Sequence, residues 1–475
     1  MLTPTVVAIG NRLFTHEELV AARHRMLGVK VPLTLRIWLA TRLMTAVGLF
    51  IPLERLRERF VAQTPVLGFG ADTLHLRLNR IADMPEVVVA EHRPVTVNVL
   101  IPTFTVDTIS AGFFGVFAFA RFIASCGFHA RLVLFDNFNF NEDRFRAALS
   151  RTTGLTDLLD KVELAYIGAR DKPLMVSADD IAVASVWYSA YFAEKIRVAC
   201  DACRFLYLVQ DYEPAFHPHN SIFALGHASY GLPAIPFFST ASLRRDFEAR
   251  GLFPGTEWED WCSFDNACSP APDVAAALQA RRTTIQRCFV FYSRPAVDRN
   301  MFELGALAIV EAFRQGVFDN GRNWRFFGMG IGAVEIYFDA KTKLVQMPRM
   351  SLDDYSKALS GFDVGLSLMA SAHPSMTPMD LAGSGVPVVT NSFGVKQPDY
   401  FEAISSNIVC AEPSLQGLVD GIRAAVALSD DMDARLRGAN LNFPTRWDET
   451  WTPRHKAFLA RAIAAARSDG EHADG

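Results

Sequence analysis

Short runs of β-branched, aromatic and aliphatic residues alternate with segments of helical period through most of the chain, from residue 95 to about residue 411. A run of this kind followed by a helical segment is typical of a β-α unit, and a series of such units is typical of parallel sheets. The runs begin at Val95, Ala130, Lys161, Asp180, Phe205 and Ala234 in the first half, and at Arg287, Trp324, Lys343, Asp363, Pro387 and Asn407 in the second. The pattern predicts an α/β protein with two parallel sheets.

A stretch without hydrophobic period separates the two series. Residues 251–274 are rich in Gly, Pro, Asp and Ser, which favours a connection between domains. We therefore expect a Rossmann-like domain over residues 93–272 and a second over residues 273–452, with an N-terminal helical extension over residues 1–92 and a C-terminal helix and tail over residues 453–475. Two such domains whose strand ends face each other would form a cleft.

The most apolar early segment starts at Val31 and is interrupted by Arg36 and Arg42. It falls short of the roughly 20 apolar residues that span a bilayer. Arginines beside Leu, Trp and Phe are also typical of a helix that lies in a membrane surface, so residues 31–57 are a candidate for peripheral membrane contact. A helix packed on the following domain is the alternative.

The charge balance and the cysteine count argue against some classes of protein. Lysine and arginine number 47, aspartate and glutamate 51, for a formal net charge of −4, and no basic stripe stands out. This balance argues against a nucleic-acid partner, although a nucleotide can still bind locally. The seven cysteines are odd in number and scattered, which does not predict a disulfide framework and favours a cytoplasmic location.

Candidate chemistry is expected just after the strands, because ligands of open parallel sheets bind there and helix N-termini offer free N–H groups. The turn after the first strand of the second half carries Arg294, Arg299 and Asn300. Two guanidinium groups at the start of a helix predict a site for a diphosphate. Surface ion pairs with Asp298 and Glu303 are the alternative.

Two further strand ends of the second half carry candidate nucleotide contacts. Met347 and Pro348 lie where main-chain groups can read the edge of a base, although they also precede an ordinary capped helix start. Asp380 ends the sequence TPMD, which fits the first turn of a helix. Asp380 therefore either caps its own helix or binds a sugar hydroxyl of a nucleotide.

In the first half, Gly112 and Gly115 follow the strand that begins at Val95 and form either a flexible ligand loop or a packing face of a helix. Another strand is followed directly by four polar residues, Gln210, Asp211, Tyr212 and Glu213. We expect these residues at the edge of the cleft. A carboxylate there can orient or deprotonate a hydroxyl group, although some of these residues can instead cap the next turn.

The run PMDLAGSGVPVVTN, which contains Asp380, resembles the Pro-Leu-Glu-Ala-Met-Ala-Ser-Gly-x-Pro-Val-Val signature of glycosyltransferase family 4. The stretches VQDYEP, FYSRPAVDRNMFELG, MSLDDY and GLSLMASAHPSMTPMDLAGSG are most similar to rhamnosyltransferases of bacterial S-layer glycan assembly and of related surface-polysaccharide synthesis. The resemblance covers residues 95–411, and its second half is the more specific.

The resemblance implies a GT-B fold with the acceptor domain first and the donor domain second. It implies a retaining, metal-independent hexosyltransferase that needs no cofactor. The implied donor is a nucleotide sugar, with dTDP-rhamnose favoured, and the implied acceptor is an oligosaccharide or lipid-linked glycan of the cell surface. We expect the enzyme in the cytoplasm, or peripheral on the inner face of the cell membrane.

For the site, the resemblance implies that Asp380 holds the ribose of the donor. Ser375 and Met376 would offer N–H groups to the diphosphate, beside the two arginines. Arg294 is then the expected catalytic cation, with Asp211 or Glu213 acting on the acceptor hydroxyl. The residues expected on the acceptor side are Gly112, Gln210 and Tyr212.

The sequence departs from the family pattern at one acidic position. The family has a second Glu eight residues before the position of Asp380, and this chain has Ala372 there, followed by His373-Pro374-Ser375 in place of Gly-Phe-Gly. An acid that would contact the transferred sugar is missing. Two alternatives therefore stay open: a nucleotide-sugar epimerase of the same fold, and a non-catalytic GT-B scaffold of a membrane glycan-assembly complex.

Overall fold

The structure is a computed structural model. It describes residues 6–9, 12–15, 81, 84–101, 111–135, 140–150, 154–168, 170, 172–257, 261–330, 336–339, 341–348 and 350–467. The chain divides into two compact units, residues 1–84 and residues 85–475. The first unit contains an antiparallel pair of strands, β1 (Val6–Ile9) and β2 (Arg12–Thr15). The candidate membrane segment, residues 31–57, and the helices predicted around it lie outside the described residues.

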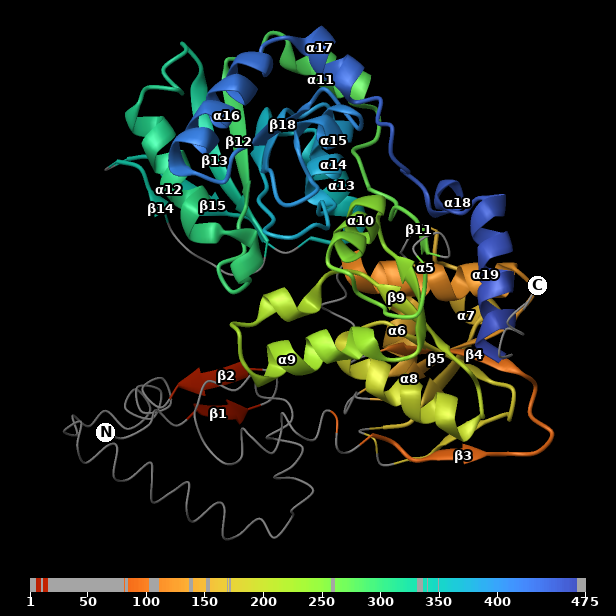
Figure 1. Ribbon diagram of the computed structural model, residues 1–475. Helices are drawn as coiled ribbons and strands as arrows, with labels where there is room; N and C mark the ends of the chain where they lie inside the picture. Colours follow the sequence, from red (N-terminus) through yellow and green to blue (C-terminus); the bar gives the residue numbers. More distant parts are fainter. Residues whose placement is uncertain are drawn as a thin grey trace, which may run out of the picture. The chain divides into compact units, whose positions relative to one another are not determined.

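The first large sheet has the strand order β11-β10-β9-β8-β4-β5-β6, and each neighbouring pair is parallel (Figure 1). Its strands are β4 (Thr96–Ile101), β5 (His129–Leu134), β6 (Glu163–Tyr166), β8 (Ile181–Ala184), β9 (Phe205–Val209), β10 (Ala234–Phe238) and β11 (Cys262–Ser263). All six strands predicted for this half are present. The additional strand, β11, comes from the segment that the sequence indicated as a connection. A small parallel sheet pairs β3 (Val87–Val89) with β7 (Leu174–Val176).

The second large sheet has the order β14-β15-β13-β12-β16-β17-β18 and is parallel except for the edge strand β14. Its strands are β12 (Gln286–Tyr292), β13 (Asn323–Met329), β14 (Ile336–Tyr337), β15 (Lys343–Gln346), β16 (Val364–Leu366), β17 (Val388–Asn391) and β18 (Ile408–Ala411). All six strands predicted for this half are present. The chain passes from the first sheet to the second between β11 and β12, near the predicted boundary at residue 272.

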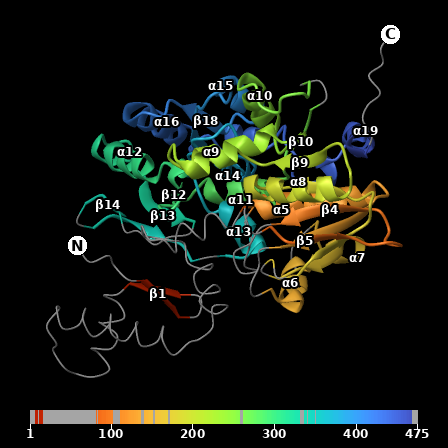
Figure 2. The same ribbon diagram turned by 60° about the horizontal axis from the view of Figure 1, so that its bottom comes forward.

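Alternate side chains of the second sheet meet different helices. Phe289 and Phe291 pack in a core with α12 (Phe302–Arg314) and α16 (Leu415–Leu428). Val290, between them, packs in a core with α13 (Leu352–Leu359), α14 (Thr377–Gly383) and α15 (Pro398–Glu402). Figures 1 and 2 show these helical layers on the two faces of the sheet. A parallel strand covered on both faces is apolar at successive positions, which explains the continuous apolar runs in the sequence.

The first sheet is covered in the same way. Helix α5 (Ala111–Ser125) packs on one face with α6 (Glu142–Leu149) and α7 (Leu158–Lys161). Helix α8 (Trp187–Ala199) packs against β8, and the ring of its Phe192 lies 5.1 Å from that of Phe135. Further α-helices in the described part of the chain are α9 (Ser221–Ala228), α10 (Ala241–Ala249), α11 (Val274–Arg281), α17 (Met432–Gly438) and α18 (Trp447–Thr450).

The last helix, α19 (Pro453–Arg467), returns to the first domain after the second sheet is complete (Figure 1). Its Phe458, Leu459 and Ile463 are buried in the core of the first sheet. The main-chain N–H of Cys203 donates to the carbonyl of Ala466 over 2.9 Å. The C-terminal helix therefore ties the two domains together. Among the helices in the described part of the chain, none is long and apolar enough to cross a membrane.

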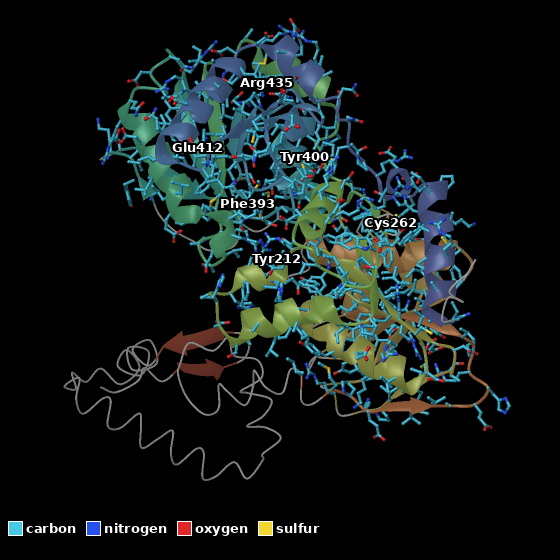
Figure 3. All side chains as sticks on the ribbon, in the orientation of Figure 1. Tyr212, Cys262, Phe393, Tyr400, Glu412 and Arg435 are labelled. Atoms are coloured by element: carbon cyan, nitrogen blue, oxygen red, sulfur yellow. The ribbon has the colours of Figure 1, made fainter. Side chains whose placement is uncertain are left out.

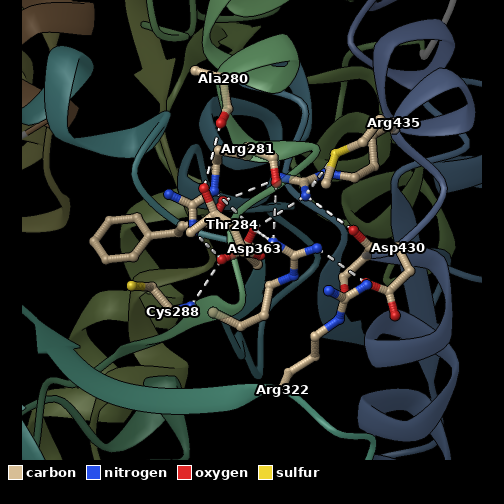
Figure 4. A network of polar contacts seen from close by, with 12 residues as sticks. Ala280, Arg281, Thr284, Cys288, Arg322, Asp363, Asp430 and Arg435 are labelled. Carbon is tan, nitrogen blue, oxygen red and sulfur yellow. Dashed lines mark hydrogen bonds and ion pairs between the residues drawn. The ribbon is translucent and has the colours of Figure 1, made fainter.

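A network of charges, buried at its centre and partly exposed at its edge, lies at the amino-terminal ends of β12 and β16 (Figure 4). We call it the base network, and it consists of Arg281, Arg287, Arg322, Asp363, Asp430 and Arg435. Asp363, fully buried, accepts hydrogen bonds from Arg281 Nε (2.9 Å), Cys288 N (2.8 Å) and Arg435 Nη1 (3.2 Å).

Arg435 completes its pairing with main-chain carbonyls. It donates to Gly385 over 2.7 Å, to Ser429 over 3.0 Å and to Phe362 over 3.2 Å. Burial lowers the pKa of Arg435 to about 10, so its guanidinium remains charged at neutral pH. The base network thus fastens α17 and α11 to the strands beneath them.

Candidate functional site

The second sheet has a switch point between β12 and β16, where the strand order reverses its direction. The chain segments that leave these two strands are hydrogen-bonded to each other at their carboxyl ends. Ala370 N donates to the carbonyl of Arg299 over 2.7 Å, and Asn300 Nδ2 donates to the carbonyl of Leu368 over 3.0 Å. Open parallel sheets bind their ligands at such points. Asn300 is buried; its amide nitrogen is used in this link, and its Oδ1 has no hydrogen-bond partner among the described residues.

Arg294 and Arg299 are brought together here, as each follows β12. Arg294 is half-buried, and its guanidinium lies 5.9 Å from the ring centre of Tyr292. Arg299 lies 4.0 Å over the ring of Phe216, a residue of the first domain. Burial lowers the pKa of Arg299, and the nearby charge of Arg294 adds to this effect while Asp211 opposes it. Among the described residues, Arg299 Nε has no hydrogen-bond partner. The two guanidinium groups therefore carry positive charge that the acidic groups of the protein neutralise only in part.

Asp211 joins the two sheet domains. Its carboxylate accepts hydrogen bonds from Tyr212 N over 2.9 Å and from the hydroxyl of Ser371, and its Oδ2 lies 3.7 Å from Arg299 Nε. A second link between the domains is the hydrogen bond from Ser242 Oγ to the carbonyl of Ala372, over 2.9 Å. Burial raises the pKa of Asp211, against the effect of Arg299. The carboxyl edges of the two sheets are therefore in direct contact.

The Glu213 carboxylate lies at the start of α8, within electrostatic reach of Asp211 and Arg299. Its Oε2 accepts a hydrogen bond from Trp187 N over 2.6 Å, so the carboxylate caps the helix. Burial raises the pKa of Glu213 to about 8, and the neighbouring Asp211 adds to the rise. Glu213 can therefore hold or release a proton near neutral pH.

The segment that carries Ala372 and Ser375 is buried between the domains. Ser375 has a positive φ of 67°, and its N–H donates to His373 Nδ1 over 3.1 Å. Burial lowers the pKa of His373 to about 3, with Lys396 and Arg299 contributing, so this imidazole is neutral. The N–H group of Ser375 that the resemblance assigned to a diphosphate is thus bonded to His373. Met376 is half-buried, and its carbonyl accepts from Asp380 N over 2.9 Å.

Asp380 is buried at the start of α14, and both of its carboxylate oxygens have donors. Ser269 N donates to Oδ1 over 2.6 Å, and Tyr355 Oη donates to Oδ2 over 2.9 Å. Burial raises the pKa of Asp380 to about 6. The carboxylate holds α13 and the connecting segment against α14. Each of its oxygens can accept a second hydrogen bond, so a sugar hydroxyl remains a candidate partner.

The other predicted residues lie at separate strand ends. Met347 N donates to the carbonyl of Gly328 over 2.8 Å and so continues the pairing of β13 with β15, and Pro348 is exposed. The ring of Tyr212 packs among aromatic side chains of the first domain, and its hydroxyl lies 2.9 Å from His227 Nδ1. Figure 3 labels Tyr212 in the first domain and Arg435 at the far end of the second. Gln210 and Gly112 approach each other at the start of α5, with 3.4 Å between Gln210 Oε1 and the position a Cβ would take on Gly112.

Sequence reasoning missed Lys396, which is fully buried in the turn after β17. Its Nζ donates to the carbonyl of Met369 over 2.9 Å, and burial lowers the pKa of Lys396 to about 7, with Asp211 opposing the shift. The only available signal was its position after a strand. We call the charged and titratable residues of this region the inter-sheet cluster, and they are Asp211, Arg294, Arg299, His373 and Lys396. Within the described residues, no group of three or more His, Cys, Asp or Glu side chains could hold a metal ion.

Two parallel sheets with Rossmann-like strand order, in contact at their carboxyl edges, define the GT-B fold, and the predicted fold class is confirmed. Family models described as the WsaF N-terminal domain and the WsaF C-terminal domain match residues 96–241 and 287–423. The chain therefore contains both WsaF domains, in that order. This agrees with the resemblance to S-layer glycan enzymes.

Relatives of the chain are found among curated proteins and solved structures. The O-antigen biosynthesis protein RfbC of Myxococcus xanthus is 28% identical over 353 residues, which are 71% of this chain and 25% of that protein. The chain thus spans about a quarter of the length of this relative. HepE of Anabaena, solved in complex with UDP-glucose, is 10% identical, with 78% of this chain and 99% of that chain covered and a TM-score of 0.50. Sucrose-phosphate synthase of Thermosynechococcus elongatus is 11% identical, with 78% and 100% covered and a TM-score of 0.48.

Proposed function

We propose that the chain is a glycosyltransferase of cell-surface polysaccharide assembly, which moves a sugar from a nucleotide sugar to a hydroxyl group of a growing glycan. The observation that carries the proposal is the pair Arg294 and Arg299 at the switch point of the second sheet, with incomplete pairing by the protein. The printed name of the relative from Myxococcus xanthus, an O-antigen biosynthesis protein, supports the polysaccharide class. The structure of HepE with UDP-glucose supports a nucleotide-sugar donor on this fold.

In this proposal the second domain binds the donor. Arg294 and Arg299 bind the diphosphate and stabilise the negative charge that grows on it as the sugar leaves, without a metal ion. Asn300 keeps the loop of these arginines in place through its hydrogen bond to Leu368. Asp380 accepts a hydrogen bond from the ribose, and the turn at Met347 and Pro348 contacts the base.

The first domain binds the acceptor, with Asp211 and Glu213 nearest to the reacting hydroxyl. Asp211 is paired with Ser371 and Arg299, so it orients groups across the two sheets rather than acting as a covalent nucleophile. Glu213, whose pKa is raised to about 8 by burial, is the group suited to exchange a proton with the acceptor. Among the described residues of the cluster, no free carboxylate is placed to act as a covalent nucleophile. We therefore propose that the acceptor hydroxyl attacks on the same face of the sugar from which the diphosphate departs, which gives retention.

A deoxy-sugar donor, with dTDP-rhamnose favoured, fits the departure from the family pattern. Ala372 offers no carboxylate, and its carbonyl is already bonded to Ser242. A sugar with fewer hydroxyl groups needs fewer protein acceptors in that place. We further propose that the enzyme works in the cytoplasm at the inner face of the membrane, with residues 31–57 as the contact.

A thermal-shift screen of the full chain against UDP, dTDP, GDP and their sugars tests the donor site. A ligand at 100 times its dissociation constant stabilises the native state by about 2.7 kcal/mol, so one nucleotide class should raise the melting temperature. In Asp380→Asn the amide can keep the contacts to Ser269 and Tyr355 while the charge is lost, and we expect about tenfold weaker donor binding. Asp353→Asn, an exposed acid on α13, is the matched control and should bind the donor like wild type.

Two outcomes would contradict the proposal. No shift with any nucleotide or nucleotide sugar would favour a non-catalytic scaffold. Turnover of the donor sugar to its epimer without any acceptor would favour an epimerase.

A further inference from the structure

Two side-chain carbonyl oxygens at the carboxyl edge of the first sheet lack hydrogen-bond donors. Gln210 Oε1 and Asn266 Oδ1 are both buried, and neither has a partner among the described residues. Gln210 follows β9, and Asn266 follows β11 in the connecting segment to which the sequence assigned no function. Buried carbonyl groups are nearly always hydrogen-bonded in native proteins, so two unpaired ones side by side require an explanation.

Each of the two amides uses its nitrogen to bond the protein, and for Gln210 the partner fixes the orientation. Gln210 Nε2 donates to the main-chain carbonyl of Ser185 over 3.3 Å, and a carbonyl can only accept, so Oε1 must point the other way. Asn266 Nδ2 donates to Ser239 Oγ over 3.0 Å. Asn266 itself is only 5% exposed, so its oxygen is shielded from solvent.

Both oxygens face the same glycine on α5. A Cβ on Gly115 would lie 3.1 Å from Asn266 Oδ1 and 3.4 Å from Gln210 Oε1. One turn earlier, a Cβ on Gly112 would lie 3.4 Å from the same Gln210 oxygen. The two glycines thus leave the face of the helix in front of the oxygens without side chains.

The chemistry of this place differs from that of the arginine pair. Two neutral carbonyl oxygens accept hydrogen bonds and donate none, so they suit hydroxyl groups and offer nothing to a phosphate. Gln210 directly precedes Asp211, whose carboxylate lies 3.7 Å from Arg299 Nε. A hydroxylic ligand at the carbonyl pair would therefore lie next to a diphosphate bound by the arginines.

We propose that Gln210 and Asn266 determine acceptor specificity, each accepting a hydrogen bond from one hydroxyl group of the acceptor's terminal pyranose. This inference rests on the proposed function and adds to it the chemical class of the acceptor, a sugar with two free hydroxyl groups in reach of this pair. A site built to bond a hydroxyl group discriminates against an analogue that lacks it, because the protein oxygen is then buried without a donor.

The test measures the binding of methyl pyranosides to the full chain by saturation-transfer NMR. The probes are methyl glucoside, mannoside, galactoside and rhamnoside, and their analogues with one hydroxyl group replaced by fluorine, which keeps the size but cannot donate. For at least one glycoside, fluorine at each of two positions should weaken binding about three- to tenfold, and fluorine elsewhere should change it little.

Isosteric variants assign each oxygen to its hydroxyl group. In Asn266→Leu, fluorine at one of the two sensitive positions of the pyranoside should no longer weaken binding, while fluorine at the other still does. In Gln210→Met the two positions should exchange their behaviour. Asn323→Leu, on the exposed start of β13, is the control and should keep both. Gly115→Ala, which places a methyl group against both oxygens without altering them, should weaken the binding of all pyranosides.

A purely structural role of the two amides would not produce this position-by-position pattern. The inference is overturned if fluorine at every position is tolerated by wild type, or if each variant weakens all analogues equally. It is also overturned if no pyranoside binds while the donor still raises the melting temperature. If instead the donor has no effect but the pyranoside pattern appears, the acceptor site stands and the proposed transfer reaction fails.

Discussion

The base network and the inter-sheet cluster are both groups of buried charges in one chain, and they differ in how completely the charges are paired. In the base network, Asp363 is bonded by Arg281, Arg435 and a main-chain N–H, and Arg435 adds three main-chain carbonyls. In the inter-sheet cluster, Lys396 has one carbonyl partner, and Arg299 Nε has no hydrogen-bond partner among the described residues. The first group lies at the amino edge of the second sheet, and the second lies at the carboxyl edges.

The difference separates structural charges from charges available to a ligand. Taking an ion out of water is unfavourable unless hydrogen bonds and opposite charges replace the lost hydration. The base network replaces this hydration almost fully, and Arg287 Nε is its one buried side-chain nitrogen without a hydrogen-bond partner among the described residues. The inter-sheet cluster leaves positive charge that an anionic ligand would pair, at the place where parallel sheets bind their ligands.

The largest effect is expected from breaking the base network with Asp363→Asn. The change leaves Arg281 and Arg435 without their common carboxylate, and an uncompensated buried charge costs about 3–5 kcal/mol. The free energy of unfolding, measured by urea denaturation, should fall by that amount. Asp433→Asn, which removes an exposed partner of Arg282, is the control and should change it by less than about 1 kcal/mol. Equal stability of the two variants would show that the network is not a structural clamp.

Arg294→Ala, in contrast to Asp363→Asn, is expected to lower turnover and to leave the free energy of unfolding nearly unchanged. The hydrogen bond from Arg294 to the Tyr292 hydroxyl is long, at 3.4 Å, so its loss should change stability little. Removing one group that stabilises the charge of the leaving diphosphate should lower turnover by about 100-fold. Arg314→Ala, whose side chain is 70% exposed on α12, should leave both turnover and stability unchanged. Normal turnover of Arg294→Ala would remove this arginine from the donor site.

Measured per pH unit, the smallest effect is expected in the pH dependence of stability through Glu213. Burial raises the pKa of Glu213 to about 8, from an ordinary value of 4.5. Between these values the native state keeps a proton that the unfolded chain releases, so this carboxyl group makes stability fall as the pH rises from about 4.5 to about 8. Glu213→Gln keeps an oxygen for Trp187 N and removes the titration, so the fall should become shallower by at most about 1.4 kcal/mol per pH unit.

Urea denaturation at several pH values between 4.5 and 9 measures this change. Glu248→Gln, an exposed acid on α10, should leave the pH profile as it is in wild type. Parallel profiles for wild type and Glu213→Gln would mean that Glu213 is ionised in the native state, and it would then be unsuited to hold a proton near neutrality.

The sequence by itself determined the elements and their order. Continuous apolar runs predict buried parallel strands because both faces of such strands are covered, and all twelve predicted strands are present. Arg294 and Arg299 could be selected because they follow a strand and begin a helix within one short segment, so their proximity is a local property. The sequence TPMD indicated the start of α14 to within one residue. The N-cap, however, is Met376, whose side chain makes no capping hydrogen bond, and Asp380 bonds Ser269 and Tyr355 rather than capping its own helix.

Only the tertiary structure decided which strand ends meet. Ser371 and Asp211 are 160 residues apart, and Ser269 and Asp380 are 111 apart, so no local pattern relates them. The same holds for α19, which packs in the core of the first domain although it follows the second domain in the chain. Lys396 and Asn266 stand in unremarkable turns of the sequence. Their roles depend on burial and on the absence of partners among the described residues, and these properties arise only when distant segments pack together.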